Sequence, residues 1–249
     1  MIGTAIESQI RRPFLQKFNE PNPMPSLAEN LDHVRATIDE AARRSGRPSS
    51  SVKLIAVSKT HPAEVIREAV EAGQESFGEN RVQEAMIKIP VLPGRLEWHL
   101  IGHLQSNKVR KALPLFQLIH GVDSVDLARD IDRIAAEAGA HPRVLLEVNV
   151  SGESSKHGFS PENLEQELEG LLALPRLQVE GFMTMAPLAR EAEASRPYFA
   201  ALRELRDRMA EKTGIPLETL SMGMSGDYQV GVEEGATLVR VGSAIFGNR

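Results

Sequence analysis

The sequence predicts an α/β fold: a single (β/α)8 barrel, also called a TIM barrel, over residues 26–249, with an additional N-terminal helix. Three observations support it. The 249 residues match the usual length of one such barrel. Eight short apolar runs alternate with helical segments, which indicates parallel strands joined by crossover helices. No composition shift or linker divides the chain after Ser26. An open, doubly wound sheet is the competing arrangement, and eight strand–helix units in this length favour the barrel.

The N-terminal segment is expected to lie outside the barrel. Three of the last five residues of segment 1–25 are prolines, which exclude a regular helix there. We predict a mobile extension over residues 1–25, and a start at Met24 is conceivable. Ser26 can cap a helix to about Arg44, because the apolar residues that follow it recur at helical spacing.

Strands are expected where short apolar runs stop at turn-forming residues. The run at 144–150 is the clearest because it consists mostly of Val and Leu. In chain order, the predicted strands are residues 52–57, 74–78, 98–102, 118–122, 144–150, 177–183, 217–222 and 237–241.

Between these strands, the apolar residues recur at helical spacing, which predicts helices there. Pro62 opens the first of these helices and Gly73 ends it, and Pro161 opens another. The predicted helices are residues 62–72, 81–87, a segment ending at 111, 126–138, 161–172 and 196–212. Because the chain ends just after the last strand, we expect the N-terminal helix to fill the place of the eighth barrel helix.

Composition narrows the classes of function. The formal net charge of −5 gives no electrostatic footprint for nucleic acid. The absence of cysteine excludes disulfides, thiolate nucleophiles and cysteine-based metal sites. There is neither an apolar run long enough to span a membrane nor a signal-peptide core. We therefore predict a cytoplasmic protein without nucleic-acid or membrane partners.

The candidate chemistry lies at the carboxyl ends of the predicted strands, where barrels carry their active sites. Lys59 follows the first strand, where partial desolvation makes an amine nucleophilic toward an aldehyde. Ser225, Gly242 and Ser243 follow the last two strands and suit a phosphate group. Arg240 lies inside the last strand and needs a partner if buried, such as a pyridine nitrogen. Pyridoxal 5'-phosphate (PLP) carries an aldehyde, a phosphate and a pyridine ring.

Other polar and sulfur-containing residues allow less specific interpretations. Asn80 can cap the next helix, point into the mouth of the barrel, or do both. Met224 is expected to line the site with apolar surface, as are Met183, Met185 and Met222.

Residues near the middle strands allow two further interpretations. His99 and His103 have the spacing of a metal pair, but they lie on a strand and a turn rather than on one helix face, and we predict no metal site. Glu147 and Asn149 are expected to point inward from one strand, and the loop at 156–159 is in a position to cover the mouth.

Several motifs together resemble the YggS/PROSC family of pyridoxal-phosphate homeostasis proteins. The resemblance extends from about Met24 to Asn248. It rests on AVSKT at 56–60, FGENRVQE at 77–84, WHLIGHLQSNK at 98–108, GFMTM at 181–185 and the region 220–247.

The resemblance implies a barrel like the N-terminal domain of alanine racemase. It implies an internal aldimine, a Schiff base, on Lys59. Phosphate contacts are implied from Ser225, Gly242 and Ser243, and a contact to the pyridine nitrogen from Arg240. The family often has threonine at position 243, and serine keeps the hydroxyl group.

Three functional hypotheses follow. The first is a PLP-binding protein of intracellular homeostasis, which sequesters the cofactor and delivers it to PLP-dependent apo-enzymes, as a monomer. No second catalytic base is evident, because neither Tyr198 nor Tyr228 is an obvious partner for Lys59, so we do not expect an enzyme. The alternative is a PLP-dependent amino-acid racemase. A metal-dependent, aldolase-like barrel is a third and weaker hypothesis.

Overall fold

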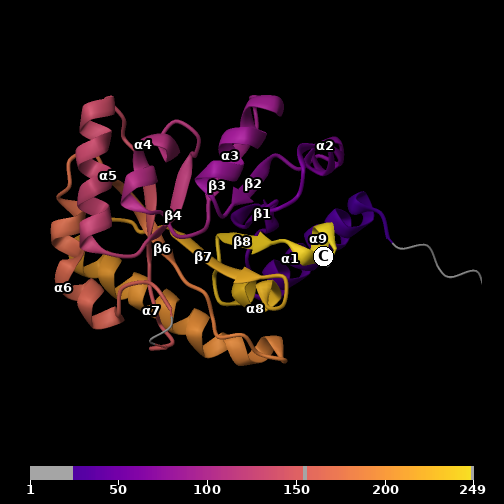
Figure 1. The fold of residues 1–249 in the computed structure, drawn as a ribbon. Helices are drawn as coiled ribbons and strands as arrows, with labels where there is room; N and C mark the ends of the chain where they lie inside the picture. Colours follow the sequence, from indigo (N-terminus) through magenta and orange to yellow (C-terminus); the bar gives the residue numbers. More distant parts are fainter. Residues whose placement is uncertain (1–24, 154–155, 248–249) are drawn as a thin grey trace, which may run out of the picture.

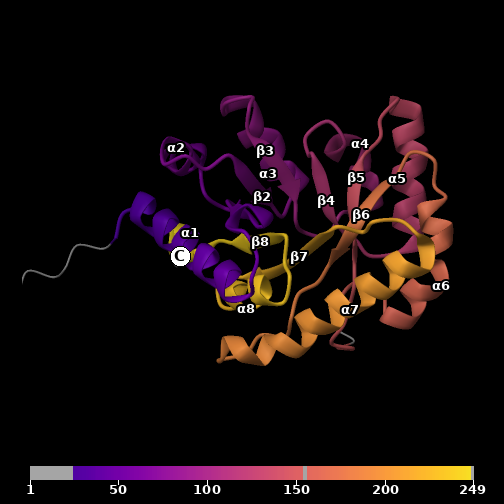
Figure 2. The ribbon, with the colours of Figure 1, turned by 180° about the vertical axis from the view of Figure 1, so that it is seen from behind.

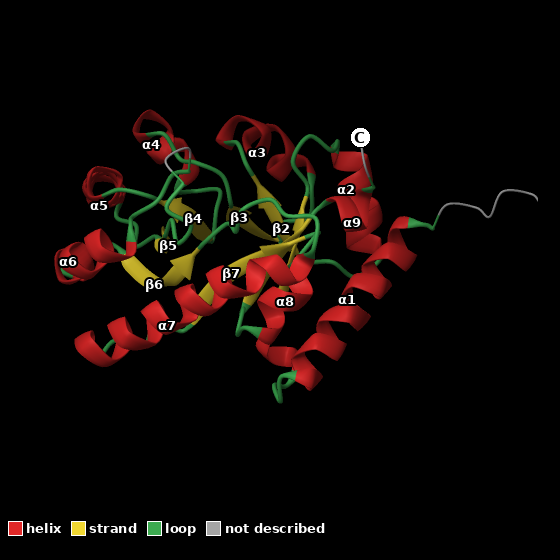
Figure 3. Cartoon of the chain, turned by 90° about the horizontal axis from the view of Figure 1, so that it is seen from below, coloured by secondary structure: helices red, strands yellow, loops and turns green. Residues whose placement is uncertain are grey.

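The computed structural model describes residues 25–153 and 156–247. Eight parallel strands follow one another in chain order and close into a barrel, and helices surround them on the outside (Figures 1 and 3). The predicted (β/α)8 barrel is therefore confirmed, and the open, doubly wound sheet is wrong. The prediction of a mobile extension over residues 1–25 falls on residues that, except for Pro25, lie outside the described part.

The strands lie close to their predicted positions. They are β1 (Lys53–Val57), β2 (Ser76–Glu79), β3 (Glu97–Leu100), β4 (Leu118–Val122), β5 (Arg143–Glu147), β6 (Gln178–Met183), β7 (Thr219–Met224) and β8 (Leu238–Val241). The clearest difference is at β5, which ends at Glu147 instead of residue 150. Asn149 stops the strand because its side-chain oxygen accepts a hydrogen bond from the Gly152 N–H at 3.1 Å, a local turn that competes with the sheet.

The helices up to residue 213 match the predicted pattern, whereas the two short helices at 228–233 and 243–246 were not predicted. They are α1 (Leu27–Arg44), α2 (Ala63–Glu71), α3 (Val82–Lys88), α4 (Val109–Ala112), α5 (Val125–Ala138), α6 (Pro161–Leu172), α7 (Arg196–Thr213), α8 (Tyr228–Glu233) and α9 (Ser243–Phe246). The helix expected to end at residue 111 is a single 3-10 turn over Ser106–Lys108 followed by the short α4. None of the described helices is long and apolar enough to cross a bilayer.

Helix α1 occupies the place of an eighth barrel helix, as predicted. Ser26 and Glu29 form a reciprocal capping box at its start. The helix packs against α2, α8 and α9 (Figures 1 and 2), and the Asn30 side-chain amide donates to the Ile245 carbonyl at 3.0 Å. This contact fixes α1 to the short helix that follows the last strand.

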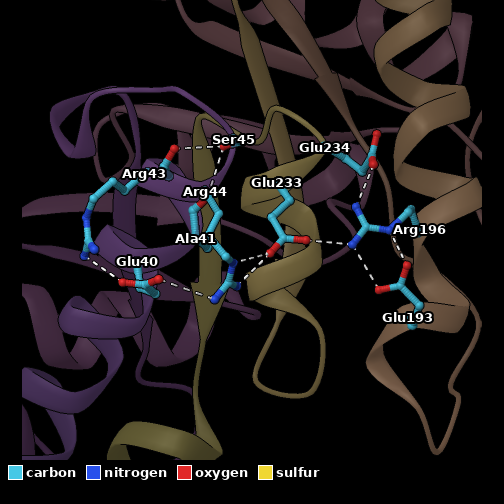
Figure 4. A network of polar contacts seen from close by, with 10 residues as sticks. Glu40, Ala41, Arg43, Arg44, Ser45, Glu193, Arg196, Glu233 and Glu234 are labelled. Atoms are coloured by element: carbon cyan, nitrogen blue, oxygen red, sulfur yellow. Dashed lines mark hydrogen bonds and ion pairs between the residues drawn. The ribbon is translucent and has the colours of Figure 1, made fainter.

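An ion-pair network joins α1, α8 and α7 on the outside of the barrel (Figure 4). Glu233 accepts from Arg44 and from Arg196, each at 2.6 Å, one through each carboxylate oxygen. Arg196 also pairs with Glu234 at 2.8 Å. Because three helices share these charges, the network fixes their relative positions more than an isolated surface pair would.

The barrel interior holds an apolar cluster and, beside it, a set of buried polar side chains. Five strands contribute to a small apolar cluster inside the barrel: Ile55, Leu118, Leu145, Met183 and Leu238. A larger apolar core fills the space between strands and helices. Buried polar side chains, among them His99, His120, Ser221 and Arg240, lie on β3, β4, β7 and β8, and Arg240 reaches the end where the candidate site is.

Candidate cofactor site

A cavity of about 680 Å³ lies at the carboxyl ends of the strands, within the size range of small-molecule sites. Its walls come from the ends of β1, β7 and β8 and from the segments that follow β2, β3 and β6. All seven residues named from the sequence line this one cavity: Lys59, Asn80, Met224, Ser225, Arg240, Gly242 and Ser243.

Lys59 is held by its two neighbours in the chain. The Ser58 carbonyl accepts from the ammonium group of Lys88 at 2.9 Å, and the Thr60 N–H donates to the carboxylate of Glu84 at 2.8 Å. Thr60 has a φ of 66°, in the left-handed region that a β-branched residue rarely adopts. The backbone on both sides of Lys59 is therefore anchored to α3, and the lysine side chain, which is half-buried, starts from a fixed position.

The anchor is centred on a buried ion pair that the sequence analysis did not single out. Glu79 is fully buried, and its Oε1 accepts from the Ser58 hydroxyl at 2.7 Å and from Lys88 Nζ at 2.8 Å. Its Oε2 has no hydrogen-bond partner within the described residues. Burial raises the pKa of Glu79, and the bonds from Lys88 and Ser58 oppose that rise. We refer to Ser58, Glu79, Glu84 and Lys88 as the β1 anchor.

The phosphate candidates lie together at the ends of β7 and β8. The Ser225 hydroxyl oxygen accepts the N–H groups of Gly242 at 3.1 Å and Ala244 at 3.4 Å. Asp227 shapes the turn that carries Ser225 by accepting the Met224 N–H at 2.7 Å. Backbone N–H groups that converge on one oxygen atom are the arrangement that binds an anionic oxygen.

Arg240 is almost completely buried and forms part of the cavity wall. Its guanidinium donates to the Ser221 hydroxyl and, at 2.9 Å, to the Thr184 carbonyl. Within the described ranges 25–153 and 156–247, no carboxylate oxygen lies close enough to form an ion pair with it. Burial lowers the pKa of Arg240 to about 10, so the group stays charged at neutral pH.

Some of the secondary predictions are wrong. Asn80 does not cap α3: the residue at the helix start is Arg81, and no side chain caps it. Asn149 lies beyond the end of β5, where its amide donates to the Glu153 carbonyl at 2.9 Å, and so it does not share an inward face with Glu147. Met183 and Met222 are buried, and neither lines the cavity, whereas Met185 and Met224 do.

His99 and His103 do not form a pair. His99 is buried and bonds through Nδ1 to His120 Nε2 at 2.9 Å. His103 lies at the surface, where its ring bonds to Asp123 at 2.8 Å and stacks on the ring of His157 with centroids 4.8 Å apart. In the loop predicted to cover the mouth, Lys156 Nζ donates to the carbonyl of the cavity residue Met185 at 3.2 Å.

Comparison with known protein families gives a match over most of the chain. Residues 30–249 match the family model described as alanine racemase, N-terminal domain. A pyridoxal phosphate homeostasis protein of Aquifex aeolicus is 46% identical over 225 residues, which cover 90% of this chain and 99% of that protein.

Proteins of known structure also resemble this chain over most of its length. PipY of Synechococcus elongatus with PLP bound is 44% identical, with a TM-score of 0.77, and the match covers 89% of this chain and all of PipY. An alanine racemase of Clostridium difficile has a TM-score of 0.71 but is only 18% identical, and the match covers 90% of this chain and 57% of the racemase. The racemase therefore supports the fold alone.

Proposed function

The chain belongs to the alanine racemase N-terminal domain family and, within it, to the pyridoxal phosphate homeostasis proteins, and from this premise we propose that it binds PLP and takes part in intracellular PLP homeostasis. Relatives that carry this name match nearly their whole length, and a similar protein of known structure has PLP bound. We further propose that the protein sequesters the cofactor and delivers it to PLP-dependent apo-enzymes.

The residues of the cavity fit the cofactor. One observation carries this assignment: an amine, a set of anion-binding N–H groups and a buried guanidinium without an ion-pair partner in the described chain line the same cavity. Lys59 would hold the cofactor covalently, Ser225, Gly242 and Ser243 would hold its phosphate, and Arg240 would face its pyridine nitrogen. Asn80 and Met224 would complete the walls around the ring.

The same residues favour holding the cofactor over carbanion chemistry. When bound, the cofactor supplies an electrophilic carbon and, with a protonated pyridine ring, an electron sink. Arg240 carries N–H donors and no acceptor, and its pKa of about 10 keeps it charged. A donor at the pyridine nitrogen disfavours protonation of that nitrogen. Arg240 would therefore hold the ring while weakening the electron sink that a racemase needs.

A visible absorbance spectrum before and after borohydride tests the binding proposal, with Lys59→Ala and the exposed Lys111→Ala as a matched pair. The wild type and Lys111→Ala should show a visible band that borohydride removes, and the reduced cofactor should then be attached covalently to Lys59. Lys59→Ala should show no such band. A wild-type protein that stays colourless after incubation with excess PLP would refute the proposed function.

Delivery and catalysis are separated by two further measurements. Mixing the loaded protein with a PLP-dependent apo-enzyme, in the presence of a trap for free cofactor, should restore that enzyme's activity. Exchange of α-protons of amino acids in deuterated water should not exceed that of free PLP, and exchange above that level would favour the racemase alternative. We expect a monomer, which sedimentation velocity measures directly.

A further inference from the structure

A continuous row of polar side chains crosses the barrel interior beneath Arg240. The Ser221 hydroxyl bonds to Arg240 Nη1 and, at 2.9 Å, to His120 Nδ1. His120 Nε2 lies 2.9 Å from His99 Nδ1. His99 Nε2 lies 3.2 Å from Glu97 Oε1, although this oxygen is off the axis of the ring N–H. Four strands contribute: β3, β4, β7 and β8.

The row joins the two ends of the barrel. Arg240 lines the cavity at the carboxyl ends of the strands. Glu97 is the first residue of β3, at the opposite end, where its carboxylate accepts from Lys53 at 2.8 Å and from the Ser76 hydroxyl at 3.0 Å. The two imidazoles between these ends are buried, His120 completely. Apolar residues usually fill this layer of a barrel, because polar side chains there lose their hydration.

The chemistry of the two end groups sets the direction of every hydrogen bond between them. A guanidinium can only donate, and an ionised carboxylate can only accept. The nearby His99 N–H lowers the pKa of Glu97, with Lys53 contributing, so Glu97 is ionised at neutral pH. Burial lowers the pKa of both His99 and His120, against the attraction of Glu97 for His99 and together with the repulsion from Lys53, Arg143 and Arg240. Both rings are therefore neutral.

One arrangement of protons pairs a donor with an acceptor at every contact of the row, with His99 Nε2–H facing Glu97 off its axis. Arg240 donates to Ser221, the Ser221 hydroxyl donates to His120 Nδ1, His120 Nε2–H donates to His99 Nδ1, and His99 Nε2–H points toward Glu97. The reverse arrangement would place the lone pair of His99 against the carboxylate. It would also leave the Ser221 hydroxyl proton without an acceptor within the described chain. Buried donors left unsatisfied in this way are costly.

We propose that Glu97, His99, His120 and Ser221 form a polarised hydrogen-bond chain that positions Arg240 and holds its guanidinium in one orientation toward the cavity. Glu97 and the two histidines are then positioning residues for a ligand that lies at the other end of the barrel. The orientation of Arg240 toward the ring nitrogen of PLP rests on the proposed function, whereas the chain itself does not.

Nitrogen NMR of the full-length, 15N-labelled protein tests the chain directly. The ring signals of the two buried histidines are assigned by their loss in His99→Gln and His120→Gln. We expect both rings to be neutral and protonated on Nε2 at about pH 7. Glu97→Gln should shift the ring signals of both histidines, whereas Glu75→Gln, which changes an exposed glutamate just before β2, should shift neither. A charged ring, a proton on His120 Nδ1, or a His120 signal unaffected by Glu97→Gln would overturn the proposal.

Ser221→Ala tests the link from the chain to the ligand. It removes one hydrogen bond to a charged group, and we expect equilibrium dialysis to show PLP affinity reduced by about tenfold, with an altered absorbance maximum. At saturation, borohydride should still label Lys59 fully. If wild type and Ser221→Ala bind PLP equally and give the same spectrum, the link fails while the proposed function stands. If wild type binds no PLP, the proposed function fails and the NMR result still decides the chain.

Discussion

The β1 anchor gives a quantitative test of how the cavity is held in place. Lys88→Met keeps most of the side-chain volume but removes the cation that donates to Glu79 and to the Ser58 carbonyl. Glu79 is fully buried, and the Lys88 side chain is 10% exposed. Removing one partner of a buried ion pair costs about 3–5 kcal/mol, because the other charge stays buried without compensation. For a chain of this size, that corresponds to a fall in melting temperature of about 6–20 °C.

Urea unfolding followed by circular dichroism measures this loss, and Lys212→Met is the matched control. Lys212 pairs with Glu169 at 3.9 Å on the surface, with side chains 49% and 74% exposed, and donates to the exposed Glu165 carbonyl at 3.2 Å. Its loss should therefore change the free energy of unfolding by less than about 1 kcal/mol. The double variant Glu79→Gln/Lys88→Met should recover at least about 2 kcal/mol, because it removes the stranded charge. A Lys88→Met protein as stable as wild type, or a double variant no more stable than the single one, would refute the reasoning.

Three further predictions concern the site, the barrel wall and the buried histidines. Ser225→Ala should weaken binding of inorganic phosphate and PLP by about tenfold in equilibrium dialysis, since it removes a hydroxyl at the anion-binding turn; unchanged affinity would place the phosphate elsewhere. Gly181→Ala should prevent folding, because a Cβ there would lie 2.0 Å from the Thr219 carbonyl oxygen. Its control, Gly170→Ala in the open surface of α6, should stabilise the protein in urea by about 0.5–1 kcal/mol. His120→Gln should reduce the loss of stability between about pH 7 and 5.5 by up to about 1.4 kcal/mol per pH unit, since burial lowers the pKa of His120 and only the unfolded chain takes up the proton; equal slopes would contradict this.

The fold was predictable because its signals are local. Each buried parallel strand is a short apolar run whatever its partners are, and each helix start or stop depends on residues next to it, such as Ser26. The exception at β5 has the same kind of cause. Val148 and Val150 continue the apolar pattern, but the side chain of Asn149 between them forms a turn of its own. The competition between strand and turn at a single asparagine cannot be settled from hydrophobic spacing.

The candidate site was predictable in part for a topological reason. In a parallel barrel all carboxyl strand ends meet at one end, so Lys59 and Ser225 line one cavity although 166 positions apart in the numbering. The β1 anchor could not be predicted from the sequence in this way. Glu79 and Lys88 looked like an ordinary residue at a strand end and a residue on a helix surface, and only the packing of α3 on the barrel shows that both are buried.

Two polar networks hold the two sides of the cavity, the β1 anchor beside Lys59 and the hydrogen-bonded row beneath Arg240. Neither network corresponds to a recognisable sequence motif. Ion pairing fixes the backbone around Lys59, and a row of neutral groups ending at a carboxylate fixes Arg240. The difference follows from what each end has to do. In the proposed function, the Lys59 amine reacts and is released, which needs a rigid backbone but a side chain that can move, and the β1 anchor holds the backbone at residues 58 and 60. A guanidinium that must hold one orientation needs contacts on the side chain itself, and the row ending at Ser221 supplies them. This division of roles fits a site that binds its ligand firmly and lets it go.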